Sequence, residues 1–519
     1  MFQRLRIART RQLVLPVTFG VFACALAAIG SWIPSLWGDE AASLMSAERP
    51  ISSLLTMLRH VDAVHGTYYL GLHAWIQIAG TSPFAIRFPS AVAVGLCTAA
   101  VVILARRLST TATAVIAGLV CAVLPRVTYA GEEARSYAFS AAIAAWLTVI
   151  FVELLRRKQH RPWLWIAYGA TLTLGFYLFL YVGLIALAHA VILVWMRPAR
   201  SFTGRWLITV GLAAIAAVPI LAMAFVERSQ VAYLARTAEV TFNSVFVSLW
   251  FGTSQFAALA WLLLIAVGCV SAADWALRRR RSRAFAQQSG NIRPAPSRTV
   301  SLELVAGAWL IVPSAVLIGS SPILSDFTAR YLTFAAPAAA ILIACAIVRI
   351  ARIARTRARL GILILLVAAV VATAVPVYSA QRGPYSKNNS DWAQLSATVG
   401  AHARPGDAVA FDESTRPSRR PRLAMRTYPA GFAGLADPTL RTPFAESASW
   451  RDVSYTVKQA FALGRFDGVQ RVWLVEYATR SRVDSFGISD LESRGFSIAK
   501  RYRDYRSEVI LLTRSGTDA

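Results

Sequence analysis

The stretch SWIPSLWGDEAAS at residues 31–43 places two adjacent carboxylates, Asp39 and Glu40, directly after a long apolar run. A charged side chain at a membrane boundary is costly unless water, a partner or a function stabilises it. A second stretch, DAVHGTYY at 62–69, adds an aspartate, a histidine and two tyrosines before the next apolar run. This alternation predicts a chain that crosses a membrane repeatedly and gathers polar residues between its spans.

The composition supports a polytopic α-helical membrane protein. Of the 519 residues, 56% are hydrophobic and 16% are charged, whereas soluble domains carry roughly 25% charged residues. The five cysteines all fall in apolar segments and show no CxxC spacing. We therefore expect neither a disulfide framework nor a cysteine-metal site.

The formal net charge of +27 is distributed as short basic runs between the apolar stretches. This pattern is typical of topology signals and not of nucleic-acid binding, which needs a basic surface interleaved with aromatic residues. The runs are Arg106-Arg107, RRKQHR at 156–161, RPAR at 197–200, RRRRSR at 278–283 and RIARIARTRAR at 349–359.

A membrane-spanning helix needs about 20 apolar residues. The candidate spans are 13–33, 88–105, 112–130, 137–155, 162–179, 181–196, 206–226, 250–272, 301–319, 331–348 and 360–378. The segment 67–80 is short and aromatic, and we assign it to an interfacial helix. With the N-terminus in the cytoplasm, every basic run then falls inside. This count predicts about eleven transmembrane helices and an extracytoplasmic C-terminus.

The composition changes at about residue 379, where alternating apolar and polar segments begin. Strands are predicted at 407–411, 471–477 and 507–513, and a helix at 388–403. We therefore expect a transmembrane domain over 1–378, whose first outer loop covers about 34–87, and an extracytoplasmic α/β domain over 379–519.

The predicted topology gathers the acidic, histidine-bearing and outer arginine-bearing segments on the extracytoplasmic side. One interpretation of Asp39 and Glu40 is a solvated pair of a surface loop. The other is a general base, Asp39, which takes a proton from an acceptor hydroxyl while Glu40 orients it or a neighbouring cation.

Asp62 and His65 lie three residues apart, so their side chains can share one face of a helical turn. His65 has a structural interpretation as a hydrogen-bonded histidine, and a functional one as a donor to a lipid phosphate or a sugar hydroxyl. The spacing of Asp39, Asp62 and His65 matches no strong ligand pattern, so we expect no metal site.

Arg135 and Arg330 each stand at the outer end of a predicted span. Snorkelling to lipid headgroups explains them structurally, but arginine is also suited to bidentate phosphate contacts. The neighbouring Glu132 and Glu133 pair with Arg135 or bind an acceptor. For Asp326, the sequence likewise does not decide between a structural and a functional role. No Walker, GxGxxG, GxSxG or HExxH motif appears, so a soluble nucleotide is not implied as the energy source.

In order and spacing, these motifs resemble the GT-C superfamily of polyprenyl-phosphate-sugar-dependent glycosyltransferases. The resemblance is specifically to the branch of protein O-mannosyltransferases, aminoarabinose transferases and actinobacterial mannosyltransferases. The resemblance covers residues 1 to about 348. It rests on WGDEAAS, DAVHGTYY, FAIRFPSAVAVGL at 84–96, ARSYA at 134–138 and ARYLTFAAPAAA at 329–340.

The resemblance implies that Asp39 is the catalytic base of an inverting transfer, with Glu40 beside it. It implies that His65, Arg135 and Arg330 hold the donor phosphate. Three further residues complete the expected donor or substrate-binding set: Asp62, Tyr69 and Glu133.

The expected reaction moves a sugar, mannose by this resemblance, from a polyprenyl-phosphate donor to a hydroxyl of a cell-envelope glycan or glycolipid. It takes place at the outer face of a bacterial plasma membrane. The partners are the lipid-linked donor, the acceptor and membrane lipid, with no cofactor and no nucleic acid. HG replaces the more usual HP of the family, and no sugar-binding repeat domain is inserted, which favours a glycan over a protein acceptor.

Three alternatives remain at this stage. The first is a transporter or flippase of lipid-linked sugars. The second is a transferase of another lipid-linked sugar such as arabinose, and the third is a structural membrane protein whose tail binds a cell-wall partner. A transporter more often shows matched, broken spans.

Overall fold

The computed structural model describes residues 2–156, 161–228, 240–289, 299–324, 327–478 and 487–514. The chain folds into two compact units, each built from two segments. The helical unit comprises Met1–Ile29 and Phe88–Ser379, and the mixed unit comprises Gly30–Arg87 and Ala380–Ala519. The first outer loop of the sequence prediction thus folds together with the C-terminal region. Asp326 and part of the segment 227–249 lie outside the described residues.

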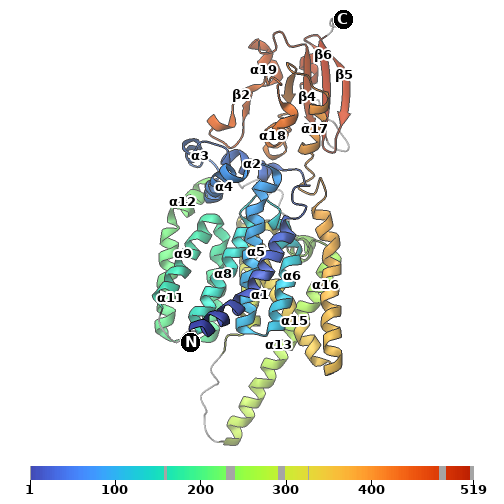
Figure 1. The fold of residues 1–519 in the computed structure, drawn as a ribbon. Helices are drawn as coiled ribbons and strands as arrows, with labels where there is room; N and C mark the ends of the chain where they lie inside the picture. The colour runs from blue at the N-terminus through green and yellow to red at the C-terminus, as the bar shows by residue number, and fades with distance from the viewer. Residues whose placement is uncertain are drawn as a thin grey trace. The chain divides into compact units, whose positions relative to one another are not determined.

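The helical unit is built mainly from long apolar helices (Figure 1). Its helices are α1 (Phe2–Ala28), α5 (Pro83–Leu108), α6 (Thr111–Val123), α7 (Pro125–Gly131), α8 (Tyr137–Arg156), α9 (Pro162–Leu178), η2 (Leu180–Gly183), α10 (Leu184–Met196), α11 (Arg200–Ala216), α12 (Val218–Val226), η4 (Ser244–Ser248), α13 (Ser254–Ser289), α14 (Leu302–Leu324), η5 (Ala329–Ala335), α15 (Ala336–Ile353), η6 (Thr356–Ala358) and α16 (Arg359–Gln381).

Six helices of the described residues are long and apolar enough to cross a membrane, or eight if each of two bent pairs is one span. The bent pairs are α6 with α7, at 58°, and α11 with α12, at 50°. Two shorter apolar helices, Leu13–Ala28 and Leu180–Met196, fall in further predicted spans. Every predicted span thus coincides with helix, which confirms a polytopic helical membrane protein, while the count of eleven stays a prediction. The segment 162–196 is not one helix, because η2 separates α9 from α10.

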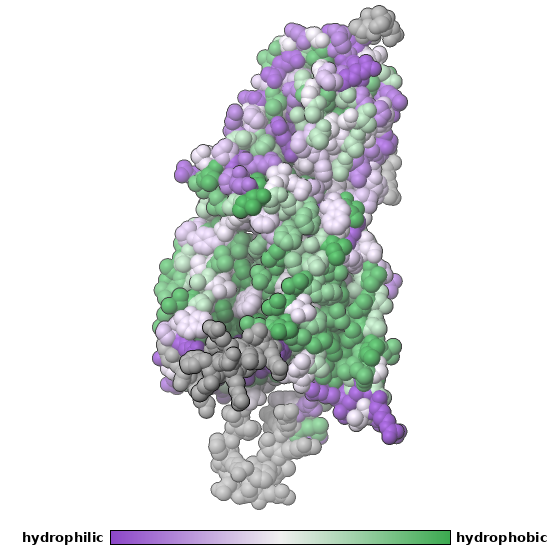
Figure 2. Space-filling view, in the orientation of Figure 1, coloured by the Kyte–Doolittle hydropathy of each residue, from purple (hydrophilic) through white to green (hydrophobic). Residues whose placement is uncertain are grey.

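Small residues set how closely these helices pack. The sequence of α15 is rich in alanine, its residues Ala336–Val348 are all buried, and the helix packs against α6, α13 and α14. Where α1 meets α5, a Cβ atom added at Gly95 would lie 2.6 Å from the Gly20 carbonyl oxygen. Such small-residue contacts let helix backbones approach in a medium that gives no hydrophobic drive for association. Figure 2 shows mainly hydrophobic residues on the visible surface of the helical unit.

The mixed unit combines short helices of the first segment with an α/β arrangement of the second. Its helices are α2 (Gly38–Ala47), α3 (Ile51–Met57), η1 (Ala63–His65), α4 (Gly66–Ala79), α17 (Trp392–His402), η7 (Pro417–Arg419), α18 (Arg422–Thr427), η8 (Pro429–Phe432), η9 (Phe444–Glu446), α19 (Val457–Ala462) and α20 (Ile488–Glu492). Its strands are β1 (Ala408–Phe411), β2 (Leu440–Thr442), β3 (Val453–Ser454), β4 (Arg471–Tyr477), β5 (Phe496–Arg503) and β6 (Ser507–Arg514).

Four strands form a sheet in the order β1-β4-β6-β5. β1 pairs with β4 in parallel, whereas β6 pairs with β4 and with β5 in antiparallel fashion. Trp473 and Val475 face one buried cluster, and Val472 and Leu474 face another, as the two-residue period of a strand requires. Burial on both faces explains the continuous apolar run of this strand.

Hydrogen bonds and packing join the first segment of the mixed unit to the second. The Leu36 amide donates to the Tyr428 hydroxyl (2.8 Å), and the Leu36 carbonyl accepts from the Ser390 hydroxyl (2.6 Å). The guanidinium of Arg49, which is 1% exposed, donates to the Ser447 carbonyl at 2.9 Å. Ala41 and Met45 of α2 belong to the same buried cluster as one face of the sheet. The C-terminal region therefore forms part of the scaffold that holds α2.

Candidate active site

Asp39 and Glu40 occupy the first turn of α2. Trp37 precedes the helix in an extended conformation, and its carbonyl accepts the Ala41 amide at 2.8 Å. The first turn of a helix favours negative charge because its amide groups point outward. The local sequence thus explains how two adjacent carboxylates are tolerated here.

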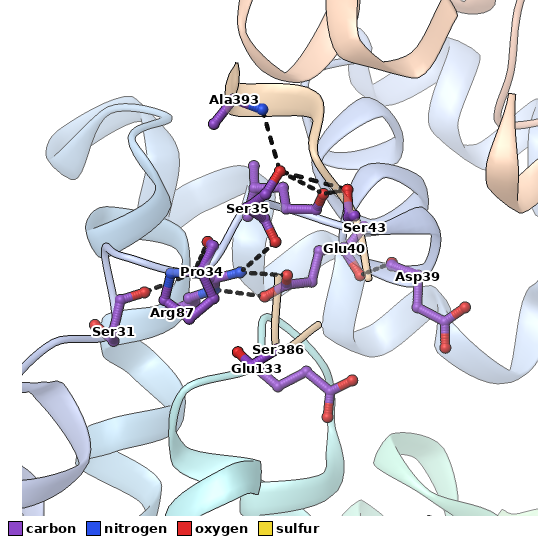
Figure 3. A network of polar contacts seen from close by, with 12 residues as sticks. Ser31, Pro34, Ser35, Asp39, Glu40, Ser43, Arg87, Glu133, Ser386 and Ala393 are labelled. Atoms are coloured by element: carbon purple, nitrogen blue, oxygen red, sulfur yellow. Dashed lines mark hydrogen bonds and ion pairs between the residues drawn. The ribbon is translucent and has the colours of Figure 1, made fainter. Parts of the chain in front are cut away.

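Glu40 forms a buried ion pair with Arg87. The Arg87 Nε and Nη2 atoms donate to the two Glu40 carboxylate oxygens at 2.7 and 2.6 Å, and both side chains are 0% exposed. Arg87 Nη1 also donates to the carbonyls of Ser31 (2.6 Å) and Pro34 (2.8 Å). The pair therefore fixes the loop that leads into α2 to the beginning of α5 (Figure 3).

Asp39 is oriented differently from its neighbour. Its side chain is partly exposed, and it points away from the Glu40–Arg87 pair in Figure 3. Its backbone carbonyl accepts the Ser43 hydroxyl at 3.1 Å, which is a contact within the helix. Of the two carboxylates, Asp39 is therefore the one with an exposed surface.

Gly38 is required by close packing within the mixed unit. A Cβ atom at this position would lie 2.3 Å from the Ser418 carbonyl oxygen and 2.9 Å from its Cα. Because these are backbone atoms, no side-chain rotation relieves the contact. The start of α2 therefore packs directly against the backbone of η7.

Gly38→Ala is expected to destabilise the protein by about 1–3 kcal/mol, because the added methyl group forces this contact apart. It should also lower any activity that depends on Asp39. Thermal unfolding in detergent measures the first effect. Gly71→Ala on α4 is the matched control, since no atom lies within 4 Å of its added Cβ. Equal unfolding temperatures for the two variants would contradict the packing argument.

Asp62, His65 and Tyr69 come together at η1 and the start of α4. The Tyr69 hydroxyl donates to Asp62 Oδ2 at 3.1 Å, and the rings of His65 and Tyr69 lie 5.9 Å apart. Asp62 has a left-handed backbone (φ 59°), which costs energy for a residue with a Cβ and is often found at functional sites. Gly66 has helical angles (φ −55°), and its small size makes room for Leu58. Helix α4 packs against α2, the helix of Asp39.

The candidate residues of the helical unit gather at the N-terminal end of α8. The Arg135 amide donates to the Glu133 carbonyl at 2.8 Å, and the Ser90 hydroxyl donates to the same carbonyl at 2.7 Å. Glu133 and Arg135 are 1% and 8% exposed. Arg330 on η5 places its guanidinium 5.9 Å from the centre of the Tyr137 ring, which begins α8.

An aromatic cluster surrounds the end of α8. The rings of Tyr181 and Tyr331 stack at 5.3 Å, and Phe179 lies 5.6 Å from Tyr137 and 5.8 Å from Tyr331. Of the two predicted arginines, Arg330 therefore lies beside this aromatic cluster. This combination suits an amphiphile with an anionic head.

Two further candidate residues, Arg87 and Arg126, were not predicted from the sequence. Arg87 lies in the motif FAIRFPS. A single arginine directly before an apolar run was the sequence feature that could have indicated it. Arg126 donates to the carbonyls of Leu249 (2.7 Å) and Ser248 (2.6 Å). It follows the bend at Pro125, which turns α7 away from α6. The sequence prediction of one continuous span over 112–130 hid this residue.

Among the described residues, no group of three or more His, Cys, Asp and Glu side chains is arranged to hold a metal ion. The expectation that the site works without metal stays a prediction.

Asp504 has a perturbed acidity close to the start of β6. Burial and the neighbouring Asp391 raise the pKa of Asp504 from 3.8 to about 6, although Thr398 donates a hydrogen bond to it at 3.2 Å. A raised carboxyl pKa means that the folded state holds a proton that the unfolded state releases. Its contribution to stability is therefore complete below about pH 4 and is lost as the pH rises through 6.

Asp504→Asn is expected to raise the unfolding temperature at pH 7 to 8, since it removes a buried charge and keeps an acceptor for Thr398. The difference from the wild type should vanish near pH 4. Differential scanning fluorimetry across this range measures it, with the exposed Asp467→Asn as control. A difference that is independent of pH would contradict the assignment.

Comparison with known proteins adds two findings. The family described as dolichyl-phosphate-mannose-protein mannosyltransferase matches residues 67–223. The structure is similar to ArnT from Cupriavidus metallidurans in the apo state, with 13% identity, 97% of this chain and 98% of that chain covered, and a TM-score of 0.56. The same enzyme bound to undecaprenyl phosphate gives 13% identity, 95% and 97% coverage and a TM-score of 0.53. Comparison with curated protein sequences gave no match.

Proposed function

We propose that this chain is a glycosyltransferase of the GT-C type that transfers a sugar from a polyprenyl-phosphate donor to a hydroxyl group, because its fold is similar to that of ArnT and residues 67–223 match the mannosyltransferase family. The acceptor is a cell-envelope glycan or glycolipid at the extracytoplasmic face of a bacterial plasma membrane. The similarity to ArnT over almost the full length of both chains is the observation that carries the proposal. The family match over 67–223 favours mannose as the sugar.

We assign the donor from the side chains of the helical unit and from the structure of ArnT with its bound lipid. ArnT has been crystallised with undecaprenyl phosphate. In this chain, Arg135 immediately precedes the start of α8, and Arg330 lies beside the Tyr137 ring at the same end of that helix. Guanidinium groups bind phosphate oxygens bidentately, and a helix bundle with an apolar surface suits the isoprenoid tail.

In the proposed reaction, Asp39 takes the proton of the acceptor hydroxyl as its oxygen attacks the anomeric carbon of the donor sugar. The bond between this carbon and the phosphate oxygen breaks, and polyprenyl phosphate leaves with the electron pair. The configuration at the anomeric carbon inverts. Arg135, Arg330 and His65 stabilise the charge that develops on the leaving phosphate.

Glu40 acts in this proposal as a positioning residue. Both of its carboxylate oxygens accept from Arg87, and the side chain is fully buried. It holds the start of α2 in place and thereby orients Asp39. Tyr69, Asp62 and Glu133 are assigned to substrate binding.

A transporter or flippase of lipid-linked sugars is the second candidate, because two helix pairs bend sharply. Broken spans are frequent in transporters. The alternative predicts movement of the intact lipid-linked sugar across the bilayer without a new glycosidic bond.

The test uses purified protein with polyprenyl-phosphomannose labelled in the sugar and a glycolipid extract as acceptor. Label that becomes covalently attached to the acceptor, with release of polyprenyl phosphate, supports a mannosyltransferase. Parallel reactions with a labelled polyprenyl-phosphate arabinose decide the sugar. Label that crosses the bilayer of proteoliposomes on the intact lipid would instead establish a flippase.

A further inference from the structure

A shallow cavity that is open to solvent lies within the mixed unit where several elements meet. It is lined by the residues before Asp39, Trp37 and Gly38, by the loop that leads into α17, by η7 and by the adjoining ends of β4 and β6. Figure 1 shows α17, β4 and β6 side by side. The mechanism described above does not use this cavity.

Two arginines converge in this cavity on one phenol oxygen. Arg419 Nη1 donates to the Tyr477 hydroxyl at 3.4 Å, and Arg506 Nη1 donates to the same atom at 3.3 Å. Arg506 Nη1 also donates to the Asn388 carbonyl at 3.2 Å. Neither guanidinium forms an ion pair with a carboxylate of the described residues. Two cations held together in this way create a site with excess positive charge.

The carboxylate that lines the cavity is already engaged. Asp391 is 1% exposed and accepts from the Arg506 amide (2.6 Å), the Ser507 amide (2.7 Å) and the Ser507 hydroxyl (3.0 Å). These bonds direct its charge into the backbone at the start of β6. The guanidinium groups therefore stay available for an anion from outside.

The loop beside Arg506 that leads into α17 is polar and strained. Asn388 and Asn389 both have left-handed backbones, with φ values of 51° and 56°, and both are exposed. Two consecutive non-glycine residues in this conformation are energetically unfavourable, and such strain is typical of functional sites. Their amide groups provide donors and acceptors suited to hydroxyl groups, and Trp37 adds an aromatic face suited to the C–H groups of a sugar ring.

We propose that this cavity binds a sugar that carries an oxyanion, a phosphate or a carboxylate, as the acceptor subsite of the transferase. Arg419 and Arg506 hold the oxyanion, and the two asparagines and Trp37 hold the sugar. The cavity is lined by Gly38, one residue before the proposed base, so the bound group belongs to the acceptor. The assignment of the ligand as an acceptor rests on the proposed function, whereas binding itself does not.

The first test measures equilibrium binding to the full-length protein in detergent without donor lipid, by ligand-observed NMR. The probes are a panel of hexose phosphates and hexuronates, the neutral hexoses and inorganic phosphate. Charged hexoses should bind at least about tenfold more tightly than neutral hexoses or phosphate alone. Equal binding of the neutral hexoses, or of inorganic phosphate, would overturn the proposal.

The variant pair is Arg419→Gln and Arg416→Gln. Arg416 is exposed and lies outside the lining of the cavity, just before η7, so the two changes remove one charge each from the same segment. Arg419→Gln should weaken charged-hexose binding by about tenfold or more, Arg419→Lys should restore part of it, and Arg416→Gln should change it by less than about twofold. Similar losses in Arg419→Gln and Arg416→Gln would overturn the proposal.

A transfer assay separates this proposal from the proposed function. Arg419→Gln should raise the KM for the acceptor and leave the donor KM and kcat unchanged. Normal transfer with an unchanged acceptor KM contradicts the acceptor subsite and leaves the transferase intact. Charged-hexose binding that depends on Arg419, without any sugar transfer, contradicts the transferase and leaves the binding site intact.

Discussion

Asp39→Asn is expected to lower kcat for sugar transfer by roughly 10²- to 10⁴-fold, the usual contribution of a positioned general base. The substitution keeps the size of the side chain and removes its ability to take the acceptor proton. Asp39 is partly exposed in the first turn of α2 and points away from the Glu40–Arg87 pair, so the change leaves that pair intact. We therefore expect the fold and the donor KM to remain close to those of the wild type.

The measurement is initial-rate transfer of labelled sugar at saturating donor, with thermal unfolding followed in the same detergent. Asp467→Asn, an exposed carboxylate of the mixed unit, is the matched control and should leave kcat unchanged. A kcat for Asp39→Asn within about threefold of the wild type would exclude Asp39 as the base. A parallel loss of unfolding temperature would indicate a structural role instead.

Arg87→Gln is expected to destabilise the protein by about 3–5 kcal/mol, because it leaves the buried Glu40 carboxylate without its bidentate partner. The variant also loses the bonds to the carbonyls of Ser31 and Pro34. The double variant Glu40→Gln with Arg87→Gln removes both charges. It should therefore be more stable than Arg87→Gln alone.

Thermal and denaturant unfolding of the purified variants measure this effect, and Arg416→Gln serves as an exposed arginine control. The single variant Glu40→Gln completes the comparison. If the destabilisations of Glu40→Gln and Arg87→Gln simply add in the double variant, the two side chains are not coupled. An unfolding temperature of Arg87→Gln equal to that of the wild type would show that the pair does not hold α2 in place.

Elements that depend on local periodicity could be predicted from the sequence. The strands expected at 407–411, 471–477 and 507–513 correspond to β1, β4 and β6, because alternating or continuous apolar runs between turn residues decide them. Each membrane span predicted from an apolar run likewise coincides with helix in the structure. The match to ArnT confirms the GT-C fold inferred from the motif order.

Contacts between distant segments could not be predicted. Glu40 and Arg87 stand 47 residues apart, and no periodicity relates them, since the tertiary arrangement of two helices brings them together. The same holds for Gly38 against Ser418, and for the shared unit of Gly30–Arg87 and Ala380–Ala519. By contrast, Tyr69 and Asp62 are only seven residues apart, so their hydrogen bond lies within one local segment, although the predicted spacing concerned Asp62 and His65.

The two-segment construction of the mixed unit has a consequence for how the protein is made. Gly30–Arg87 leaves the ribosome before the whole of Phe88–Ser379, and its partners in Ala380–Ala519 follow only afterwards. At typical synthesis rates this interval is on the order of tens of seconds. During that time the apolar faces of α2 that later pack on the sheet have no native partner. Biogenesis of this protein therefore includes a late step that depends on completion of the chain, and truncated translation products should be recognised as incomplete by the quality-control proteases of the cell.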